Sequence, residues 1–433
     1  MKEQDKGKSG LTRRNFLTLT GEALVAGGAV LGMGSAADAL TAKPAPAAQN
    51  SKMAAEPFWG QHQGGILTPQ QRHTYFAAFD LPDAKREDVI GLLQEWTNAA
   101  ARMTAGQTAK PFAQDASQPG PDGGEALGLP PERLTLTFGF GPTMFESGGQ
   151  DRFGLKSHRP EALVDLPHFN GDQLLDTRTG GDLSVQACSD DPQVAFHAVR
   201  ELARVSYGAA QVRWVQAGFM PGYGPNETPR NLMGFKDGTS NPAPGNPHDM
   251  EKYVWVGHEG PDWLQGGSYL VVRRIRMALE HWDRMSVGFQ EQTVGRHKYS
   301  GAPLGSKDEF DPVDLDANDK DGNPIIPDNA HVRLAMAASN DGARIFRRPY
   351  SYNDGVTFTS ERWPPWRQGM EYDAGLFFVS YQQDPRTGFI KIFDQMSKLD
   401  MLNQFVTHNG SGIFACPGGV AKGEYIGQRL FSG

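Results

Sequence analysis

The sequence is poor in cysteine and has no excess of basic residues. Only Cys188 and Cys416 occur among 433 residues, which excludes a disulfide scaffold, a zinc site built from cysteines and a cysteine-ligated iron–sulfur cluster. Whether these two cysteines pair stays open at this level. The formal net charge is −8 and the isoelectric point is near 5.8, whereas a nucleic-acid-binding protein carries a basic patch that attracts phosphate. Nucleic-acid binding is therefore excluded as a function class.

Motifs for nucleotide and hydrolytic chemistry are also missing. Gly139 and Gly141 lack the third glycine of the dinucleotide fingerprint G-x-G-x-x-G, and no G-x-x-x-x-G-K-[ST] run occurs. The sequence contains no H-E-x-x-H zinc helix and no G-x-S-x-G nucleophile elbow. The attachment motif C-x-x-C-H is absent too, so any haem in this protein would be held without a covalent bond.

The first 39 residues have the three parts of an export signal. A basic segment at 2–14 precedes a mildly apolar segment at 16–34, and Ala37-Asp38-Ala39 fits the cleavage site. Glu22 and the glycines of the apolar segment disfavour a stable membrane span. Residues 12–17 (Thr-Arg-Arg-Asn-Phe-Leu) are similar to a twin-arginine signal, whose pathway exports folded proteins to the periplasm. The alternative is an ordinary secretory signal that happens to contain two arginines.

The remainder of the chain predicts a flexible leader at 40–57 and two halves, at 58–225 and 226–433. In the first half, apolar spacing predicts strands at 73–81, 134–140, 182–188 and 211–220. A helix precedes the second of these strands, and Asp191-Pro192 opens another before the fourth, as a cap followed by proline. In the second half, strands are expected at 268–276 and 372–381, and Asp384-Pro385 repeats the cap before an apolar stripe that ends at Leu399. This repeat predicts two βαββαβ, ferredoxin-like halves of the α+β class.

Two short segments are rich in side chains that can carry chemistry. Residues 234–242 place Asp237 among glycines and hydroxyl groups, and residues 330–352 contain His331 and the pair Arg347-Arg348. Each also has a structural interpretation, namely a surface turn, a packed histidine and a solvated pair of arginines. Spacing alone leaves these alternatives open. His197 is expected to be solvated, since it shares the polar side of its helix with Gln193 and Glu201.

From about residue 57 to its end, the chain closely resembles the dye-decolorizing peroxidase family. The resemblance rests on several motifs in order: Gly-Phe-Lys-Asp-Gly-Thr-Ser-Asn-Pro at 234–242, Val-Val-Arg-Arg-Ile-Arg at 271–276, Trp-Asp-Arg at 282–284, Gly-Arg at 295–296, Gly-Ala-Pro at 301–303, His-Val-Arg at 331–333, Phe-Arg-Arg at 346–348 and Phe-Ala-Cys-Pro at 414–417. It implies a fold of the dimeric α/β barrel type, in which the antiparallel sheets of two ferredoxin-like halves pack together. It also implies one haem b per chain, bound non-covalently by the C-terminal half.

The resemblance assigns roles to residues one by one. His331 matches the proximal ligand of the haem iron, Asp237 the distal acid and Arg347 the distal cation. Further haem contacts are implied at the turn Gly238, Thr239 and Ser240 and at Arg333, Met336, Ala337 and Ala338. Family members often have Asn-Pro-Arg shortly after the proximal histidine, where this chain has Met336-Ala337-Ala338, so a propionate contact there is in doubt. Asp384 and Asp394 are candidates to accept the second N–H of His331.

These residues fit peroxide chemistry. A carboxylate can move a proton between the two oxygens of hydrogen peroxide, and a fixed guanidinium stabilises the charge that develops on the leaving oxygen. Because aspartate has a lower reference pKa than histidine, activity under acidic conditions is expected. Cys188, in an apolar strand, is expected to serve packing.

The expected substrates are hydrogen peroxide with an organic reductant. With the twin-arginine leader, the resemblance is strongest to the exported, iron-uptake branch of the family, which implies haem as a second substrate, deferrochelatase activity and partners among iron-uptake proteins. A homodimer is also expected. The alternative from another class is a haem carrier without catalysis.

Overall fold

The structure is a computed structural model that describes residues 55–112, 117–223, 227–360, 366 and 368–432. The predicted signal peptide and residues 40–54 of the predicted leader lie outside this part of the chain. Among the described residues, no helix combines the length and the apolar character needed to cross a membrane.

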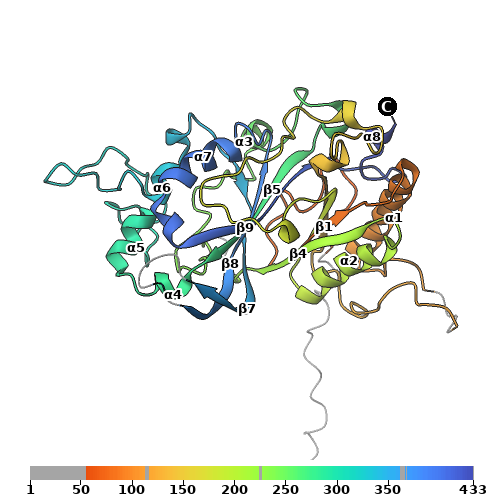
Figure 1. The fold of residues 1–433 in the computed structure, drawn as a ribbon, viewed down its shortest axis with the longest axis horizontal. Coiled ribbons are helices and arrows are strands. Elements are labelled where there is room, and N and C mark those ends of the chain that lie inside the picture. Colours follow the sequence, from red (N-terminus) through yellow and green to blue (C-terminus); the bar gives the residue numbers. More distant parts are fainter. Residues whose placement is uncertain (1–54, 113–116, 224–226, 361–365, 367, 433) are drawn as a thin grey trace, which may run out of the picture. The chain divides into compact units, whose positions relative to one another are not determined.

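The first half is a βαββαβ unit. In chain order it contains β1 (His73–Asp80), α1 (Arg86–Thr104), β2 (Thr135–Phe140), β3 (Leu183–Ser189), α2 (Pro192–Val205) and β4 (Gln211–Phe219). The strands lie in the antiparallel order β2-β3-β1-β4, and Figure 1 shows α1 and α2 near β1 and β4. The two helices pack together through buried faces, and the Trp96 indole donates to the Leu202 carbonyl at 2.9 Å. Each of these elements agrees with the periodicity of the sequence.

The second half repeats this strand order with a different first crossover. Its strands are β5 (Ser268–Met277), β6 (Phe346–Arg347), β7 (Tyr350–Ser360), β8 (Gln368–Gln382) and β9 (Val406–Cys416), and α7 (Phe389–Leu399) lies between β8 and β9. Read from its other edge, the first half has the order β4-β1-β3-β2, and the second half has the equivalent order β9-β5-β8-β7. The short strand β6 pairs with β8 beside β7. Where the first half has the single helix α1, the second has a long segment with α4 (Leu279–Trp282), α5 (Val287–Val294) and α6 (His331–Ala335). Two further short helices are α3 (Pro247–Tyr253) and α8 (Gln428–Phe431).

The two halves share one nine-stranded sheet. They join where Phe140 of β2 pairs with Ala415 of β9 and where Phe219 of β4 pairs with Ser351 of β7. Because β5 also pairs with β8, the strands close into a ring, with β6 as an addition to β8. The expected α+β class and paired halves are confirmed, and the sheets meet through their edges. Cys188 and Cys416 are buried and unpaired by a disulfide.

One of the two predicted helix caps is wrong. The Asp191 carboxylate accepts the N–H groups of Gln193 and Val194 and caps α2 as expected. Asp384 instead accepts from the N–H and the guanidinium of Arg386, and α7 begins five residues later at Phe389. Leu399, expected in the apolar stripe of α7, is 56% exposed, whereas Met396 one turn earlier is buried.

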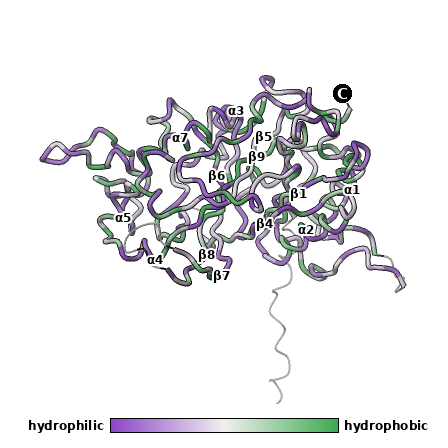
Figure 2. The backbone as a smooth tube through the Cα atoms, in the orientation of Figure 1, coloured by the Kyte–Doolittle hydropathy of each residue, from purple (hydrophilic) through white to green (hydrophobic). Residues whose placement is uncertain are grey.

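The acidic stretch 305–329 forms an excursion between α5 and α6. It extends outward beside α6 in Figure 1, and Figure 2 colours its outer part as hydrophilic. Arg333 holds the base of the excursion, because its Nη2 donates to the carbonyls of Leu315 and Ile326, at 2.7 Å each.

Candidate active site

Asp237 and Arg347 form an ion pair although 110 residues separate them. Arg347 Nη1 donates to Asp237 Oδ1 at 2.8 Å, a charge-assisted hydrogen bond that holds both groups in a fixed geometry. The side chains are 26% exposed for Arg347 and 16% exposed for Asp237. The fold therefore brings the two predicted catalytic residues to one place.

Asn241 fixes the backbone of Arg347. Its Nδ2 donates to the Arg347 carbonyl at 2.9 Å, and its Oδ1 accepts the Arg347 N–H at 2.8 Å. Arg347 lies on β6, which pairs on its other side with β8 at Ser380. The Asn241 amide thus completes the strand's hydrogen bonding and ties the segment 234–242 to β6. Sequence reasoning named Asn241 only as part of a motif.

Glu309 supports the turn around Asp237 through its carboxylate. Thr239 Oγ1 donates to Glu309 Oε1 at 3.0 Å, and Lys236 forms an ion pair with the same carboxylate. Burial raises the pKa of Glu309, but hydrogen bonds from Lys236, Thr228 and Thr239 outweigh this effect and lower it. An ionised Glu309 therefore anchors the turn.

Gly238 and Ser240 complete the turn that the family resemblance associated with the cofactor. Gly238 adopts φ +124°, a backbone conformation that favours glycine. Ser240 is exposed and Gly238 is half-buried. The Thr239 hydroxyl donates to Glu309, and contacts of Gly238, Thr239 and Ser240 with a cofactor stay predictions.

His331 is held by Asp400. Asp400 Oδ2 accepts from His331 Nδ1 at 2.7 Å, and Asp400 Oδ1 accepts the Leu402 N–H at 2.8 Å. The Asp400 side chain is 3% exposed, so both of its oxygens are committed inside the protein. In the neutral imidazole, this hydrogen bond places the proton on Nδ1 and the lone pair on Nε2.

The surroundings of His331 leave Nε2 open to a ligand. Burial lowers the pKa of His331, but the Asp400 carboxylate, through its charge and its hydrogen bond, raises it overall. Asp237 raises this pKa further and Arg347 lowers it, so the field of the ion pair reaches the imidazole. The side chain is 35% exposed, and no described residue hydrogen-bonds to Nε2.

Asp400 replaces the two acceptors that the sequence suggested. Asp384 bonds to Arg386, and Asp394 is 56% exposed beside Lys398. Those two candidates are wrong because the carboxylate that reaches His331 comes from Asp400, directly after the last residue of α7. Asp400 also caps the 3-10 turn Met401–Gln404, and a capping aspartate after a helix was its only signal in the sequence.

The remaining predicted contacts lie next to His331 in the chain. Arg333 donates Nε and Nη2 to backbone carbonyls of the excursion, which gives its guanidinium a structural role. Met336 ends α6, and Ala337 and Ala338 lie in the 3-10 turn Ala337–Ser339. Contacts of these four residues with a cofactor stay predictions. The prediction for His197 is wrong, since it is 5% exposed and contacts Glu125 and Asp122, under a loop that covers this face of α2.

Comparisons with known proteins match the whole folded part of the chain. Residues 63–220 match the family model described as Dyp-type peroxidase, N-terminal, and residues 228–421 match Dyp-type peroxidase, C-terminal. The chain is 38% identical to the dye-decolorizing peroxidase of Thermobifida fusca, with all of both chains covered. It is 34% identical to the deferrochelatase of Escherichia coli K12, with 99% of both covered.

Solved structures agree with these matches. The structure of an oxyferrous complex of DtpA from Streptomyces lividans aligns with a TM-score of 0.78 at 41% identity. The alignment covers 89% of this chain and 100% of the other. The similarity therefore extends across both halves and includes the segments that carry Asp237, His331 and Arg347.

Proposed function

The chain belongs to the Dyp-type peroxidase family, and we propose that it binds haem b non-covalently at His331 and reduces hydrogen peroxide while oxidising an organic donor. The observation that carries this proposal is the combination of two pairs: His331 held by Asp400 with Nε2 open, and Asp237 held by Arg347. Family membership supports a peroxidase.

The residues of the site fit a haem iron. A neutral imidazole that donates its other N–H to a buried carboxylate is the arrangement by which proteins orient a metal-binding histidine and make it a stronger ligand. The S. lividans relative is described as an oxyferrous complex, which indicates iron in that protein. Haem iron supplies the centre at which peroxide is bound and reduced.

The protein residues would supply the proton transfer. Asp237 accepts a proton from one oxygen of hydrogen peroxide and returns it to the other oxygen, which leaves as water. Arg347 stabilises the negative charge that develops as the O–O bond lengthens. Because the ion pair is preformed at 2.8 Å, little reorganisation is needed at the moment of reaction. Asn241 and Glu309 keep the two groups at this distance.

Two variants test the proposal. Haem-loaded Asp237→Ala is expected to lose about 10²–10⁴-fold of peroxide-dependent oxidation of a chromogenic donor, the usual contribution of a positioned acid–base group. His331→Ala is expected to lose the haem absorption band. Asp249→Asn, on α3 outside the site, is the matched control for removing one carboxylate. A parent protein without peroxide turnover would refute the peroxidase and favour a haem carrier.

A second activity is suggested by the relatives named deferrochelatase. The E. coli protein is named deferrochelatase, and we propose that this chain likewise releases iron from haem and leaves the porphyrin intact. The expected result is fluorescence of metal-free protoporphyrin from haem-loaded protein without added acid. If iron is released only together with breakdown of the porphyrin, this second activity is refuted.

Location and partners follow as proposals from the sequence. The twin-arginine pattern at 12–17 supports export to the periplasm as a folded protein, and the deferrochelatase relative supports partners in iron uptake. A homodimer is proposed as the assembly. The route is tested by fractionating cells that produce the chain either with Arg13-Arg14 or with two lysines in their place. The chain with Arg13-Arg14 should reach the periplasm and the chain with two lysines should not. If the first chain stays inside, or if both reach the periplasm, the proposed route is overturned.

A further inference from the structure

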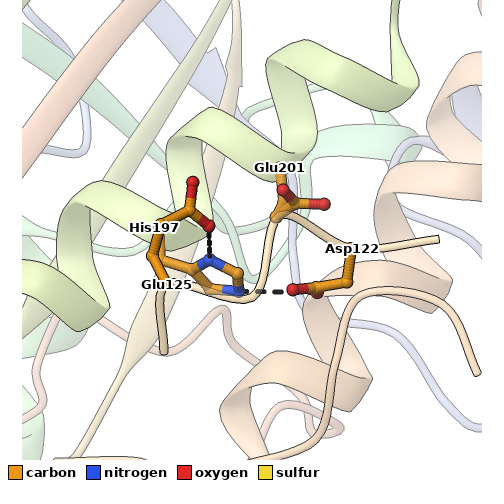
Figure 3. Close-up of side chains that lie close together, drawn as sticks. All are labelled: Asp122, Glu125, His197 and Glu201. Atoms are coloured by element: carbon orange, nitrogen blue, oxygen red, sulfur yellow. Dashed lines mark hydrogen bonds and ion pairs between the residues drawn. The ribbon is translucent and has the colours of Figure 1, made fainter. Parts of the chain in front are cut away.

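A histidine and three carboxylates meet between α2 and the loop that follows α1, outside the candidate active site. His197 and Glu201 lie one turn apart on α2, and Asp122 and Glu125 come from the loop (Figure 3). One potential ligand atom from each of the four lies within 4.8 Å of all the others. The side chains of Asp122, His197 and Glu201 are 1%, 6% and 0% exposed, so this is a buried set of groups.

Glu125 orients the His197 ring. Its Oε2 lies 2.8 Å from His197 Nδ1. Because Glu125 lies on the Nδ1 side of the ring, Nε2 is directed away from this carboxylate. A histidine whose second nitrogen is held by a carboxylate in this way is prepared to bind a metal.

His197 Nε2 faces a second carboxylate without a normal hydrogen bond. Its distance to Asp122 Oδ2 is 3.5 Å, beyond the usual range for a nitrogen–oxygen hydrogen bond. No other described residue bonds to Nε2. Asp122 is fixed by backbone, since its Oδ2 accepts the Ala109 N–H at 2.7 Å and its Oδ1 accepts the Gly124 N–H at 2.8 Å.

The 3.5 Å separation fits two ligands of one metal ion. Two atoms that each lie about 2.1 Å from a tetrahedrally coordinated zinc ion are about 3.4 Å apart. A nitrogen lone pair and a carboxylate oxygen repel one another unless a cation lies between them. The two candidates for that cation are a proton and a metal ion.

A cavity of about 60 Å³ gives access to both groups. Asp122 and His197 line it together with turns of the covering loop and with Val194. One water needs roughly 10–15 Å³ of such space, so several waters fit and can complete a coordination sphere.

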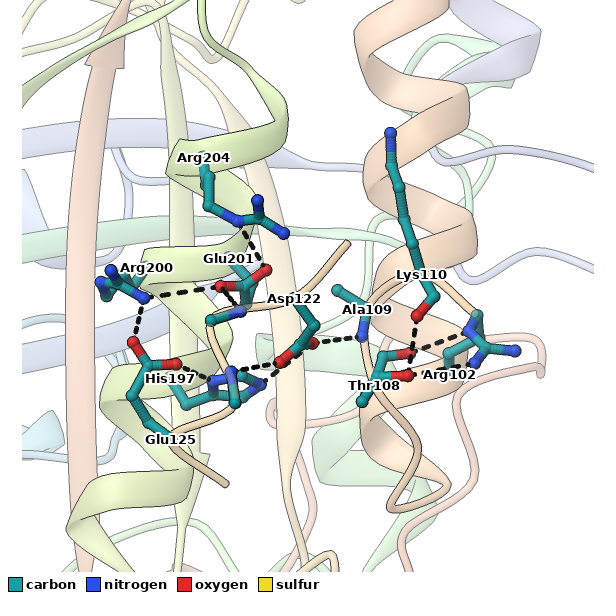
Figure 4. Close-up of polar contacts among 12 residues, drawn as sticks. Arg102, Thr108, Ala109, Lys110, Asp122, Glu125, His197, Arg200, Glu201 and Arg204 are labelled. Atoms are coloured by element: carbon teal, nitrogen blue, oxygen red, sulfur yellow. Dashed lines mark hydrogen bonds and ion pairs between the residues drawn. The ribbon is translucent and has the colours of Figure 1, made fainter. Parts of the chain in front are cut away.

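Two arginines occupy the outer side of the cluster (Figure 4). Arg204 Nε donates to Glu201 Oε2 at 3.0 Å, while Arg200 pairs with Glu125 and lies 3.6 Å from Glu201. Both are partly exposed. They partly neutralise Glu125 and Glu201 and leave the Asp122 and His197 side, which borders the cavity, as the place for a cation.

We propose that His197 Nε2 and Asp122 Oδ2 bind one divalent transition metal ion, with cavity waters filling the remaining positions. Glu201 Oε1 accepts the Gly123 N–H at 2.9 Å and faces Arg200, so Glu201 supports the covering loop and contributes negative charge near the ion. Glu125 is a positioning residue that holds the imidazole. Imidazole and carboxylate together suit zinc-like ions better than the hard cations magnesium and calcium, which take oxygen ligands. This site is separate from the haem chemistry and does not depend on it.

Calorimetry with the metal alone tests the site. Haem-loaded protein is dialysed against a chelator and titrated with ZnCl₂, and one ion per chain is expected at this site. His197→Gln and Asp122→Asn are each expected to weaken binding at least 100-fold. Glu125→Gln, which leaves an acceptor for Nδ1, is expected to weaken it about 10–100-fold. His248→Gln is the matched control, because that histidine is 83% exposed beside Asp249.

A second measurement separates loss of binding from loss of fold. Excess Zn²⁺ is expected to raise the unfolding temperature of the parent and of His248→Gln but not that of His197→Gln, since a ligand stabilises only a fold that binds it. No binding by the parent, or equal binding by parent and His197→Gln, overturns the metal site and leaves a proton as the cation between Nε2 and Asp122. Neither readout involves peroxide turnover, so the two proposals fail independently.

Discussion

Replacing Asp400 with asparagine should show how much the Asp400 carboxylate contributes to haem binding by His331. Its carboxylate accepts from His331 Nδ1 at 2.7 Å through one oxygen and from the Leu402 N–H at 2.8 Å through the other. Asparagine keeps one acceptor oxygen and puts an NH₂ group in place of the second. Either the imidazole or the Leu402 N–H then faces a donor, inside a site where Asp400 is 3% exposed.

Two estimates of the size of this effect agree. A buried donor left without an acceptor costs about 1–3 kcal/mol. Loss of the partner of a metal-binding histidine typically costs about 10–100-fold in affinity, which is about 1.4–2.7 kcal/mol. We therefore expect Asp400→Asn to bind haem about 10–100-fold more weakly. The pKa of His331 should also fall, because the carboxylate that raises it has lost its charge.

The assay is a titration of haem into haem-free protein, followed by the absorption band, with parent, Asp400→Asn and Asp394→Asn. Asp394 is the matched control, because it lies on α7, is 56% exposed and pairs with Lys398. Exposed pairs of this kind contribute at most about 1 kcal/mol to stability, and this one has no contact with His331. Equal haem affinity of Asp400→Asn and parent would refute the reasoning, as would a larger loss in Asp394→Asn.

Three further predictions concern the surroundings of the site. Asn241→Ala removes both hydrogen bonds to the Arg347 backbone. At about 1 kcal/mol for each bond, kcat/KM for peroxide should fall by up to about 30-fold while the haem content stays the same. An unchanged kcat/KM would exclude a positioning role for Asn241. Gly238→Ala meets no side chain closer than 3.8 Å, so its expected cost of about 1–3 kcal/mol in urea unfolding comes from φ +124°, and a neutral effect would contradict this. Burial, and then the Arg273 charge, lower the pKa of His408 well below its ordinary value. The unfolded chain therefore binds a proton below about pH 6.5 that the folded chain does not. The free energy of unfolding should fall on acidification from pH 7 to 5, and His408→Gln should reduce this slope; equal slopes would rule out His408 as the source.

The elements of the first half, and the strands β5 and β8 of the second, were readable from the sequence because they have local apolar patterns. The stripe in α1 and the apolar run in β1 need no knowledge of distant residues. The strands β6, β7 and β9 were not predicted. The repeat of two halves was predicted correctly although one of its two supports, the Asp384 cap, is wrong. What is repeated is the strand order, which the sequence only suggests.

Contacts between distant segments needed the tertiary structure. The motifs named Asp237, His331 and Arg347, but each had a structural alternative until the fold placed Asp237 and Arg347 2.8 Å apart. Asp400 could not be chosen among several aspartates, because the choice depends on where α7 ends relative to α6.

His197 was predicted to be exposed, and no pattern in the sequence indicates that a distant loop buries it. Its helical position indicates a polar face, and that face is indeed polar, yet a loop rich in glycine and proline covers it and buries the ring. By itself the sequence determined the helices and strands of the first half, the strands β5 and β8 of the second half, which family motifs are present and which function classes are excluded. The tertiary structure decided which polar groups are desolvated together, since burial and pairing depend on chain segments that are close in space and far apart in sequence.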